Sequence, residues 1–226
     1  MSVKDTVCIV PARGGSKGIK DKSIQPLGKA PLLSWPIRVA KASPRIGRVI
    51  VSTDGEKIAR VGEAENAEVW IRPAELAQDN STVRDLIFHL IDRFEEEGAV
   101  PEKIVYLEPT SPFRVTKDIH ACLDVLEEGQ FDSVATFVKS HVHPTWMFEQ
   151  NAEDSWKAFQ EGHTPWTYGS ESSQQAYELN GGVYVFKTAS FLREDPVGIY
   201  FGKRGFQLMP EERSIDIDEP IDLIRA

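Results

Sequence analysis

The sequence predicts an α/β fold in which a mostly parallel central sheet carries helices on both faces. Short apolar runs of strand length alternate with longer stretches of helical apolar spacing between residues 7 and 138. Polar or glycine-rich residues follow most of the apolar runs, at the position where sheets of this kind bind ligands. The length of 226 residues, with 41% hydrophobic and 27% charged residues, suits one globular domain over residues 1–226.

Apolar periodicity and turn residues place the individual elements. Runs of Val, Ile and aromatic residues predict strands at residues 7–10, 48–54, 68–73, 103–112, 133–138 and 180–186. Apolar residues three and four apart predict helices at residues 30–43, 55–66, 81–98 and 117–129. Ser81 or Thr82 can cap the third of these helices. Residues 212–226 close the chain with a predicted strand, an acidic turn and the start of a helix.

Residues 141–173 interrupt the alternation of strands and helices with a sequence rich in aromatic, polar and glycine residues. We interpret this segment as an insertion within the single domain. Its aromatic side chains are costly to leave in water, so we expect them to be covered. They are Trp146, Phe148, Trp156, Phe159 and Trp166.

Composition excludes several classes of protein. Charge or proline interrupts every apolar stretch well before about 18 residues, so no membrane span is predicted. The first ten residues lack the features of a signal peptide, and the cytoplasm is the expected location. Cys8 and Cys122 lie far apart in apolar text and are expected to be buried thiols rather than a disulfide. The net charge of -9 argues against a nucleic-acid-binding protein.

A basic loop in this acidic chain predicts a small anionic ligand. Residues 11–23, PARGGSKGIKDKS, follow the first predicted strand and contain three glycines. Successive amides of such a loop, together with the following helix, can converge on phosphate oxygens. The spacing matches neither the dinucleotide fingerprint nor the Walker loop. The cations Arg13, Lys17, Lys20 and Lys22 favour a triphosphate or a pyrophosphate leaving group, the alternative being a surface turn whose lysines face water.

Two carboxylates near the end of the chain predict a metal site. Asp216 and Asp218 are two residues apart on the last predicted strand, so both point to the same face. Mg²⁺ prefers a few oxygen ligands and keeps waters that phosphates can replace. An acidic edge strand or a cap for the last helix is the alternative reading.

Six segments in order resemble the acylneuraminate cytidylyltransferases, which activate sialic acid and related nonulosonic acids as CMP-sugars. PARGGSKGIKDK resembles the family loop A-R-x-x-S-K-G-x-x-x-K, and STDGEKIA resembles the end of its second strand. RPAELAQD matches R-P-x-x-L-A-x-D, and LEPTSPFR matches L-Q-P-T-S-P-L-R. NGGVYVF resembles N-G-A-I-Y, and SIDIDEPIDL resembles S-I-D-I-D-x-x-x-D-L.

The resemblance implies a Rossmann-like nucleotidyltransferase of the nucleotide-diphospho-sugar transferase type that uses CTP and Mg²⁺. Arg13 and Lys22 would be catalytic, stabilising charge on the triphosphate. The nucleotide-binding residues would be Ala12, Arg13, Gly14, Gly15, Ser16, Lys17, Lys22, Arg72, Asp79 and Ser81. Glu108, Thr110, Asn180 and Tyr184 would contact the sugar, and Asp216 with Asp218 would hold the metal.

The resemblance also implies a homodimer, because the family segment that matches residues 141–173 reaches across to a second copy. The aromatic content of the insertion fits this role, and a local satellite core is the alternative. CTP and a sugar acid are the implied small-molecule partners, with neither nucleic acid nor membrane involved.

Two departures from the family pattern leave the acceptor open. Glu108 stands where the family has Gln, and Ser170 and Glu178 stand where the family places basic residues that meet the sugar carboxylate. These carboxylates would repel an acidic sugar unless another cation intervenes. The acceptor is therefore a sugar acid, another nonulosonic acid, or a neutral or phosphorylated sugar, and the base can be other than cytosine. A non-catalytic nucleotide sensor is the alternative of another class.

Overall fold

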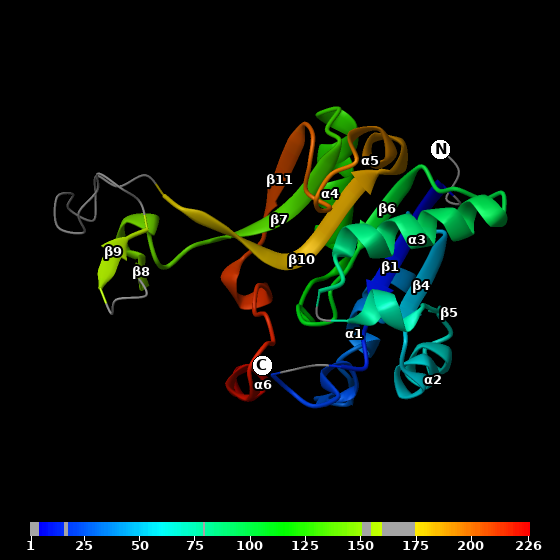
Figure 1. Cartoon of the computed structure of the whole chain (residues 1–226), viewed down its shortest axis with the longest axis horizontal. Helices are drawn as coiled ribbons and strands as arrows, with labels where there is room; N and C mark the ends of the chain where they lie inside the picture. Colours follow the sequence, from blue (N-terminus) through cyan, green and yellow to red (C-terminus); the bar gives the residue numbers. More distant parts are fainter. Residues whose placement is uncertain (1–4, 16–17, 79, 151–154, 160–174) are drawn as a thin grey trace.

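The computed structural model of the chain describes residues 5–15, 18–78, 80–150, 155–159 and 175–226. Its centre is a seven-stranded sheet with the order β11-β7-β10-β6-β1-β4-β5 (Figure 1). The strands are β1 (Thr6–Pro11), β4 (Arg48–Thr53), β5 (Glu68–Ile71), β6 (Lys103–Tyr106), β7 (Ser133–Lys139), β10 (Tyr177–Lys187) and β11 (Arg204–Leu208). Neighbouring strands pair in parallel except at β10, which is antiparallel to β6 and β7. The predicted mostly parallel sheet is confirmed.

Helices cover both faces of the sheet, as predicted. They are α1 (Ser34–Lys41), α2 (Glu56–Ala64), α3 (Val83–Glu96), α4 (Thr116–Glu128), α5 (Thr188–Glu194) and α6 (Pro220–Arg225). One core cluster joins α1, α2 and α4 to one face through Ile37, Ile58 and Leu123. A second cluster joins α3 and α5 to the other face through Leu90 and Phe191. The sheet is therefore buried on both sides, which explains why its strands read as nearly continuous apolar runs.

Some element bounds differ from the sequence-based expectation. The first helix begins at Ser34 because residues 30–31 (β3, Ala30–Pro31) pair with β2 (Pro26–Leu27) in a small hairpin. Thr82 rather than Ser81 caps α3, accepting a hydrogen bond from the backbone N–H of Asp85. Helix α5 and edge strand β11 were not predicted.

The strand predicted at the start of residues 212–226 is wrong. Residues 214–218 form neither a helix nor a strand and pair with no strand of the described sheet. Ile217 is fully buried, but it packs in a small separate cluster with Ile19, Leu27 and Leu32. Its apolar alternation therefore reflects contact with the loop after β1 rather than a place in the sheet.

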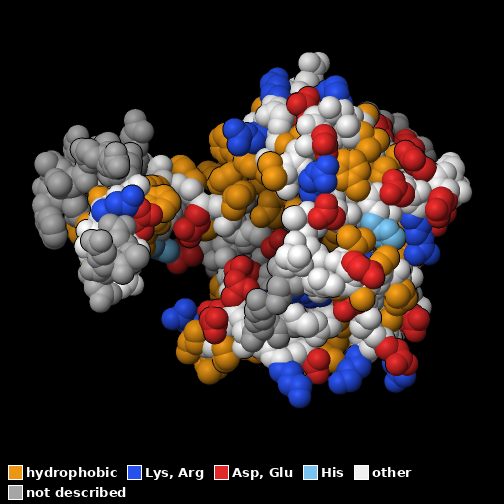
Figure 2. All heavy atoms as spheres, in the orientation of Figure 1, with side chains coloured by type: hydrophobic (Ala, Val, Ile, Leu, Met, Phe, Trp, Pro, Cys, Tyr) orange, Lys and Arg blue, Asp and Glu red, His pale blue; other side chains and the backbone are white. Residues whose placement is uncertain are grey.

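The described part of the insertion lies at one end of the molecule, away from α3 (Figures 1 and 2). β8 (Phe148–Gln150) and β9 (Trp156–Ala158) form an antiparallel pair there. Trp156 and Phe159 are 65% and 67% exposed. Trp146 and Phe148 are also exposed, so water reaches part of each of these four aromatic side chains. Trp166 lies outside the described residues.

Cys8 and Cys122 are free and buried, as predicted. Among the helices of the described residues, none has the length and apolar character needed to cross a membrane.

Candidate functional site

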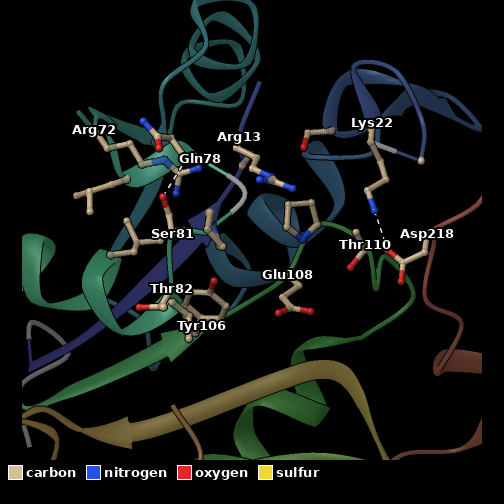
Figure 3. Close-up of a pocket in the computed structure, with 18 of the residues that line it drawn as sticks. Arg13, Lys22, Arg72, Gln78, Ser81, Thr82, Tyr106, Glu108, Thr110 and Asp218 are labelled. Atoms are coloured by element: carbon tan, nitrogen blue, oxygen red, sulfur yellow. Dashed lines mark hydrogen bonds and ion pairs between the residues drawn. The ribbon is translucent and has the colours of Figure 1, made fainter. Parts of the chain in front are cut away.

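A cavity of about 670 Å³ opens where the loops after β1, β5 and β6 meet the segment before α6 (Figure 3). Parallel strands end on the same edge of a sheet, which explains why loops far apart in sequence converge here. Most of the described site residues predicted from sequence line it. They are Ala12, Arg13, Lys22, Arg72, Ser81, Glu108, Thr110, Asp216 and Asp218. Gly18, Gln78, Thr82, Tyr106 and Glu219 line it as well, although none of them was predicted to bind a ligand.

The glycine loop is anchored by a carboxylate from the next strand. The backbone N–H of Gly14 donates to Asp54 Oδ1 at 3.0 Å, just beyond the end of β4. Gly18 lies directly against the backbone of Asp218: a Cβ at this position would lie 2.5 Å from the Asp218 carbonyl oxygen. Only glycine therefore allows this approach between the amino-terminal loop and the carboxyl-terminal segment. Ser16 and Lys17 lie outside the described residues.

Three cations face the cavity from two loops: Figure 3 shows Arg13 and Lys22 from the loop after β1, and Arg72 from the loop after β5. Arg72 is 7% exposed, and its Nη2 lies 4.0 Å from Asp54 Oδ1. Burial lowers the pKa of Arg72, and the positive charge of Arg13 lowers it further, whereas Asp54 opposes both. Arg72 Nε has no hydrogen-bond partner among the described residues. A buried guanidinium with an unused donor beside a second guanidinium is suited to an anion with several oxygens.

The two predicted metal carboxylates line the cavity from the irregular segment before α6. The Thr110 side chain hydrogen-bonds to Asp216, and the backbone N–H of Ile217 donates to the Thr110 carbonyl at 2.8 Å. Lys22 Nζ donates to Asp218 Oδ1 at 2.8 Å (Figure 3). The cationic loop and the carboxylate segment are therefore in direct contact, although they lie at opposite ends of the sequence.

This pair of carboxylates fits a hard divalent cation that also binds phosphate. Among the described residues, no cluster of three or more His, Cys, Asp or Glu side chains could hold an ion alone. Enclosure in the cavity raises the pKa of Asp216, and the charge of Asp218 raises it further. Two neighbouring carboxylates with few other protein ligands match the donor set of Mg²⁺, which takes its remaining ligands from water and substrate phosphates.

Glu108 is a half-buried carboxylate of the cavity without a hydrogen bond from any described residue. Burial raises its pKa to about 7, and the negative charges of Asp216 and Asp218 contribute to the shift, whereas Arg114 and Lys22 oppose it. Arg114 is fully buried and donates to the carbonyls of Glu108 and Gly182. Two cations thus act on Glu108, and Arg114, which sequence reasoning missed, is the buried one.

Asn180 and Tyr184 do not line this cavity. The Asn180 side chain is buried and hydrogen-bonds to Thr136, Ser214 and the backbone of Gly182. Tyr184 stacks edge-on against Tyr106, with 6.3 Å between ring centres. Burial raises the pKa of Tyr184, and the charge of Glu108 is the next cause. A role for these two residues in sugar binding stays a prediction.

Ser81 shapes the turn between β5 and α3. Its hydroxyl donates to the Glu75 carbonyl at 2.7 Å and accepts from the Gln78 backbone N–H at 3.0 Å. The turn brings Gln78 to the cavity wall, and Asp79 lies outside the described residues.

Comparison with known proteins identifies the family of this chain. The family model for cytidylyltransferases matches residues 7–194. This chain belongs to the cytidylyltransferase family. The resemblance stated from the sequence is thereby confirmed.

Several curated relatives of this cytidylyltransferase are similar over nearly its whole length. Post-translational flagellin modification protein B of Campylobacter coli is 27% identical over 97% of this chain and 92% of its own. CMP-N,N'-diacetyllegionaminic acid synthase of Legionella pneumophila is 29% identical over 96% of this chain and 92% of its own. N-acylneuraminate cytidylyltransferase of Escherichia coli is 28% identical over 96% of this chain, which spans only 50% of that relative.

Solved structures show the same fold. A CMP:2-keto-3-deoxy-manno-octonic acid synthetase solved with CTP superposes with a TM-score of 0.66 at 13% identity, covering 98% of this chain and 96% of that one. A 4-diphosphocytidyl-2C-methyl-D-erythritol synthase from Anaerococcus prevotii superposes with a TM-score of 0.63 at 14% identity, covering 100% and 97%. These likenesses support the nucleotidyltransferase fold expected from the sequence.

Proposed function

We propose that this cytidylyltransferase transfers the CMP group of CTP to a sugar acid of the nonulosonic type and releases pyrophosphate. One observation carries the proposal: the cationic glycine loop and a pair of aspartates meet around one cavity, with Lys22 in contact with Asp218. The names of the similar proteins, two of them CMP-sugar or acylneuraminate enzymes, support CTP and a sugar acid as substrates.

The triphosphate would lie against the cations of the cavity. Arg13 and Lys22 approach it from the loop after β1 and Arg72 from the loop after β5, and Arg72 Nε, which has no partner among the described residues, can donate a hydrogen bond to it. The amides of the loop after β1 add further donors. Donors fixed before the reaction stabilise negative charge that grows on the departing pyrophosphate at little reorganisation cost.

Asp216 and Asp218 would hold Mg²⁺. When bound, the ion screens the charge of the phosphates and orients the α-phosphate for attack. For the metal to reach Asp218, Lys22 has to exchange its carboxylate partner for a phosphate oxygen. Both interactions are ionic and the carboxylate is largely exposed, so the exchange is cheap.

In the reaction, the anomeric hydroxyl oxygen of the acceptor forms a bond to the α-phosphorus. The bond from that phosphorus to the bridging oxygen breaks, and pyrophosphate leaves with the electron pair. The hydroxyl proton passes to water. Glu108 and Thr110 on the cavity floor would contact the acceptor. The positive charges of Lys22 and the buried Arg114 offset part of the negative charge of Glu108. This would reduce the repulsion between Glu108 and an acidic sugar.

We further propose a homodimer. Trp146, Phe148, Trp156 and Phe159 are exposed on a part of the chain that stands away from the sheet. Large apolar side chains gathered on one surface are typical of protein interfaces. Light scattering of the purified chain should give twice the mass of 25.3 kDa. A monomer at micromolar concentration would refute the dimer.

Free thiols at Cys8 and Cys122 are usual in the reducing cytoplasm, where we place the reaction.

A substrate screen tests the activity. Purified protein is incubated with Mg²⁺, each of the four nucleoside triphosphates and a panel of acidic, neutral and phosphorylated sugars, and pyrophosphate release is measured. We expect release only with CTP and a sugar acid. Release with another nucleotide or sugar would redirect the assignment within the fold. CTP binding without release in any combination would refute catalysis.

A further inference from the structure

The segment that carries Asp216 and Asp218 has no sheet partner among the described residues to fix it. Residues 214–218 form neither a helix nor a strand, and they follow a short 3₁₀ turn at Glu211–Arg213. Metal carboxylates must keep their positions within a fraction of an ångström to bind well. Contacts outside regular secondary structure must therefore hold this segment in place.

Besides the cavity contacts of Asp216 and Asp218 and the packing of Ile217, three polar contacts tie this segment to the rest of the described structure. The Ile217 backbone binds the Thr110 carbonyl at 2.8 Å, and Asn180 Nδ2 donates to Ser214 Oγ at 2.8 Å. The third contact is ionic: Arg213 Nη2 donates to Asp118 Oδ1 at 2.7 Å, and its Nε donates to Oδ2 at 3.2 Å. A two-point arginine–carboxylate pair fixes orientation as well as distance, and it is stronger than a neutral hydrogen bond.

The carboxylate that receives Arg213 is itself fixed. Asp118 is 5% exposed in the first turn of α4, and its Oδ2 also accepts from the backbone N–H of Val115 at 2.9 Å. The loop between β6 and α4 that contains Val115 also supplies Glu108 and Thr110 to the cavity. The ion pair thus ties the carboxylate segment to the start of α4, beside the loop that forms the cavity floor.

We infer that Arg213 is a positioning residue, which through its two-point contact with Asp118 holds Asp216 and Asp218 where a divalent cation binds. Arg213 does not line the cavity and touches no substrate. Replacing Arg213 should therefore weaken metal binding and leave the affinity for CTP in the absence of metal nearly unchanged. The inference rests on the proposed function, in which Asp216 and Asp218 bind a divalent cation together with CTP.

The experiment measures three quantities on the full chain: Mn²⁺ affinity with saturating CTP, CTP affinity in EDTA, and the free energy of unfolding in EDTA. Removing a partner that orients a metal ligand typically weakens metal binding by about 10- to 100-fold. We expect Arg213→Gln to weaken Mn²⁺ binding by that amount and to change metal-free CTP affinity by less than about twofold. Arg213→Lys keeps the charge but loses the two-point geometry, so an intermediate loss is expected.

Arg45→Gln is the matched control, because Arg45 pairs with Asp124 and Glu127 farther along the same helix. This variant should bind Mn²⁺ like the wild type. Unchanged Mn²⁺ affinity in Arg213→Gln would overturn the inference, and so would an equal loss of metal-free CTP affinity. If Arg213→Gln does not fold, Arg213→Lys decides by the same criteria. A wild type that binds CTP but no Mn²⁺ would refute the metal part of the proposed function, and the inference with it.

Discussion

Replacing Glu108 by Gln tests the electrostatics of the cavity without any ligand. The Glu108 carboxyl has a pKa of about 7 in the folded chain, raised mainly by burial, against about 4.5 for an ordinary glutamate. Between these values the folded state binds more protons than the unfolded state. Its stability therefore falls as pH rises through this window and stays lower above it.

The size of the effect follows from the shift. A difference of roughly 2.5 pKa units corresponds to about 3 kcal/mol at most. Because the side chain is partly solvated and coupled to Asp216, we expect about 1–3 kcal/mol. The new side chain in the variant Glu108→Gln cannot ionise, so the variant escapes this loss. Its unfolding free energy relative to that of the wild type should therefore increase by this amount from about pH 5 to about pH 8.

Urea unfolding followed by tryptophan fluorescence, without metal or nucleotide, measures this difference. Glu96→Gln is the control, because Glu96 is an exposed glutamate at the end of α3. It should follow the wild-type pH dependence. The quantity to compare is the difference in unfolding free energy between each variant and the wild type. If this difference is the same at about pH 5 and about pH 8 for Glu108→Gln, as expected for Glu96→Gln, the electrostatic picture of the cavity floor is wrong.

Three further substitutions test the ligand-binding groups. Arg13→Ala should lower turnover by about 100-fold with little change in unfolding, as for the loss of one charge-stabilising donor; turnover equal to that of Lys29→Ala, an exposed lysine that does not line the cavity, would remove Arg13 from the mechanism. Gly18→Ala places a Cβ 2.5 Å from the Asp218 carbonyl and should weaken CTP binding about tenfold or more, whereas Gly198→Ala, outside the cavity lining, meets nothing within 4 Å of its Cβ and should have little effect; calorimetry showing equal affinities would contradict the close contact. Asp218→Asn should raise the Mg²⁺ concentration needed for half-maximal activity about tenfold or more, and superimposable Mg²⁺ titrations would exclude it as a ligand.

The sequence predicts the core of this fold well because the central strands are buried on both faces. Continuous apolar runs such as residues 7–10 and 49–51 have no other stable placement between two helical layers. The last predicted strand failed because Ile217 is buried by Ile19 and Leu32 rather than by a sheet, and period-two alternation does not identify the partner.

The candidate site was predictable where charge is concentrated in short motifs. Arg13, Lys22, Asp216 and Asp218 all line the cavity, and Lys22 contacts Asp218 there. Residues that act through backbone contacts left no such signal. Asp54 anchors the glycine loop, and no local pattern distinguishes it from an ordinary acidic residue after a strand.

The contact between Lys22 and Asp218 determines the order in which the site fills. While the ammonium neutralises this carboxylate, a divalent ion arriving alone would find one of its two proposed protein ligands already paired with a positive group. An ion arriving on a triphosphate brings the anion that draws the lysine away. Metal and nucleotide should therefore enter as one unit, and the empty enzyme should ignore free cations in its surroundings.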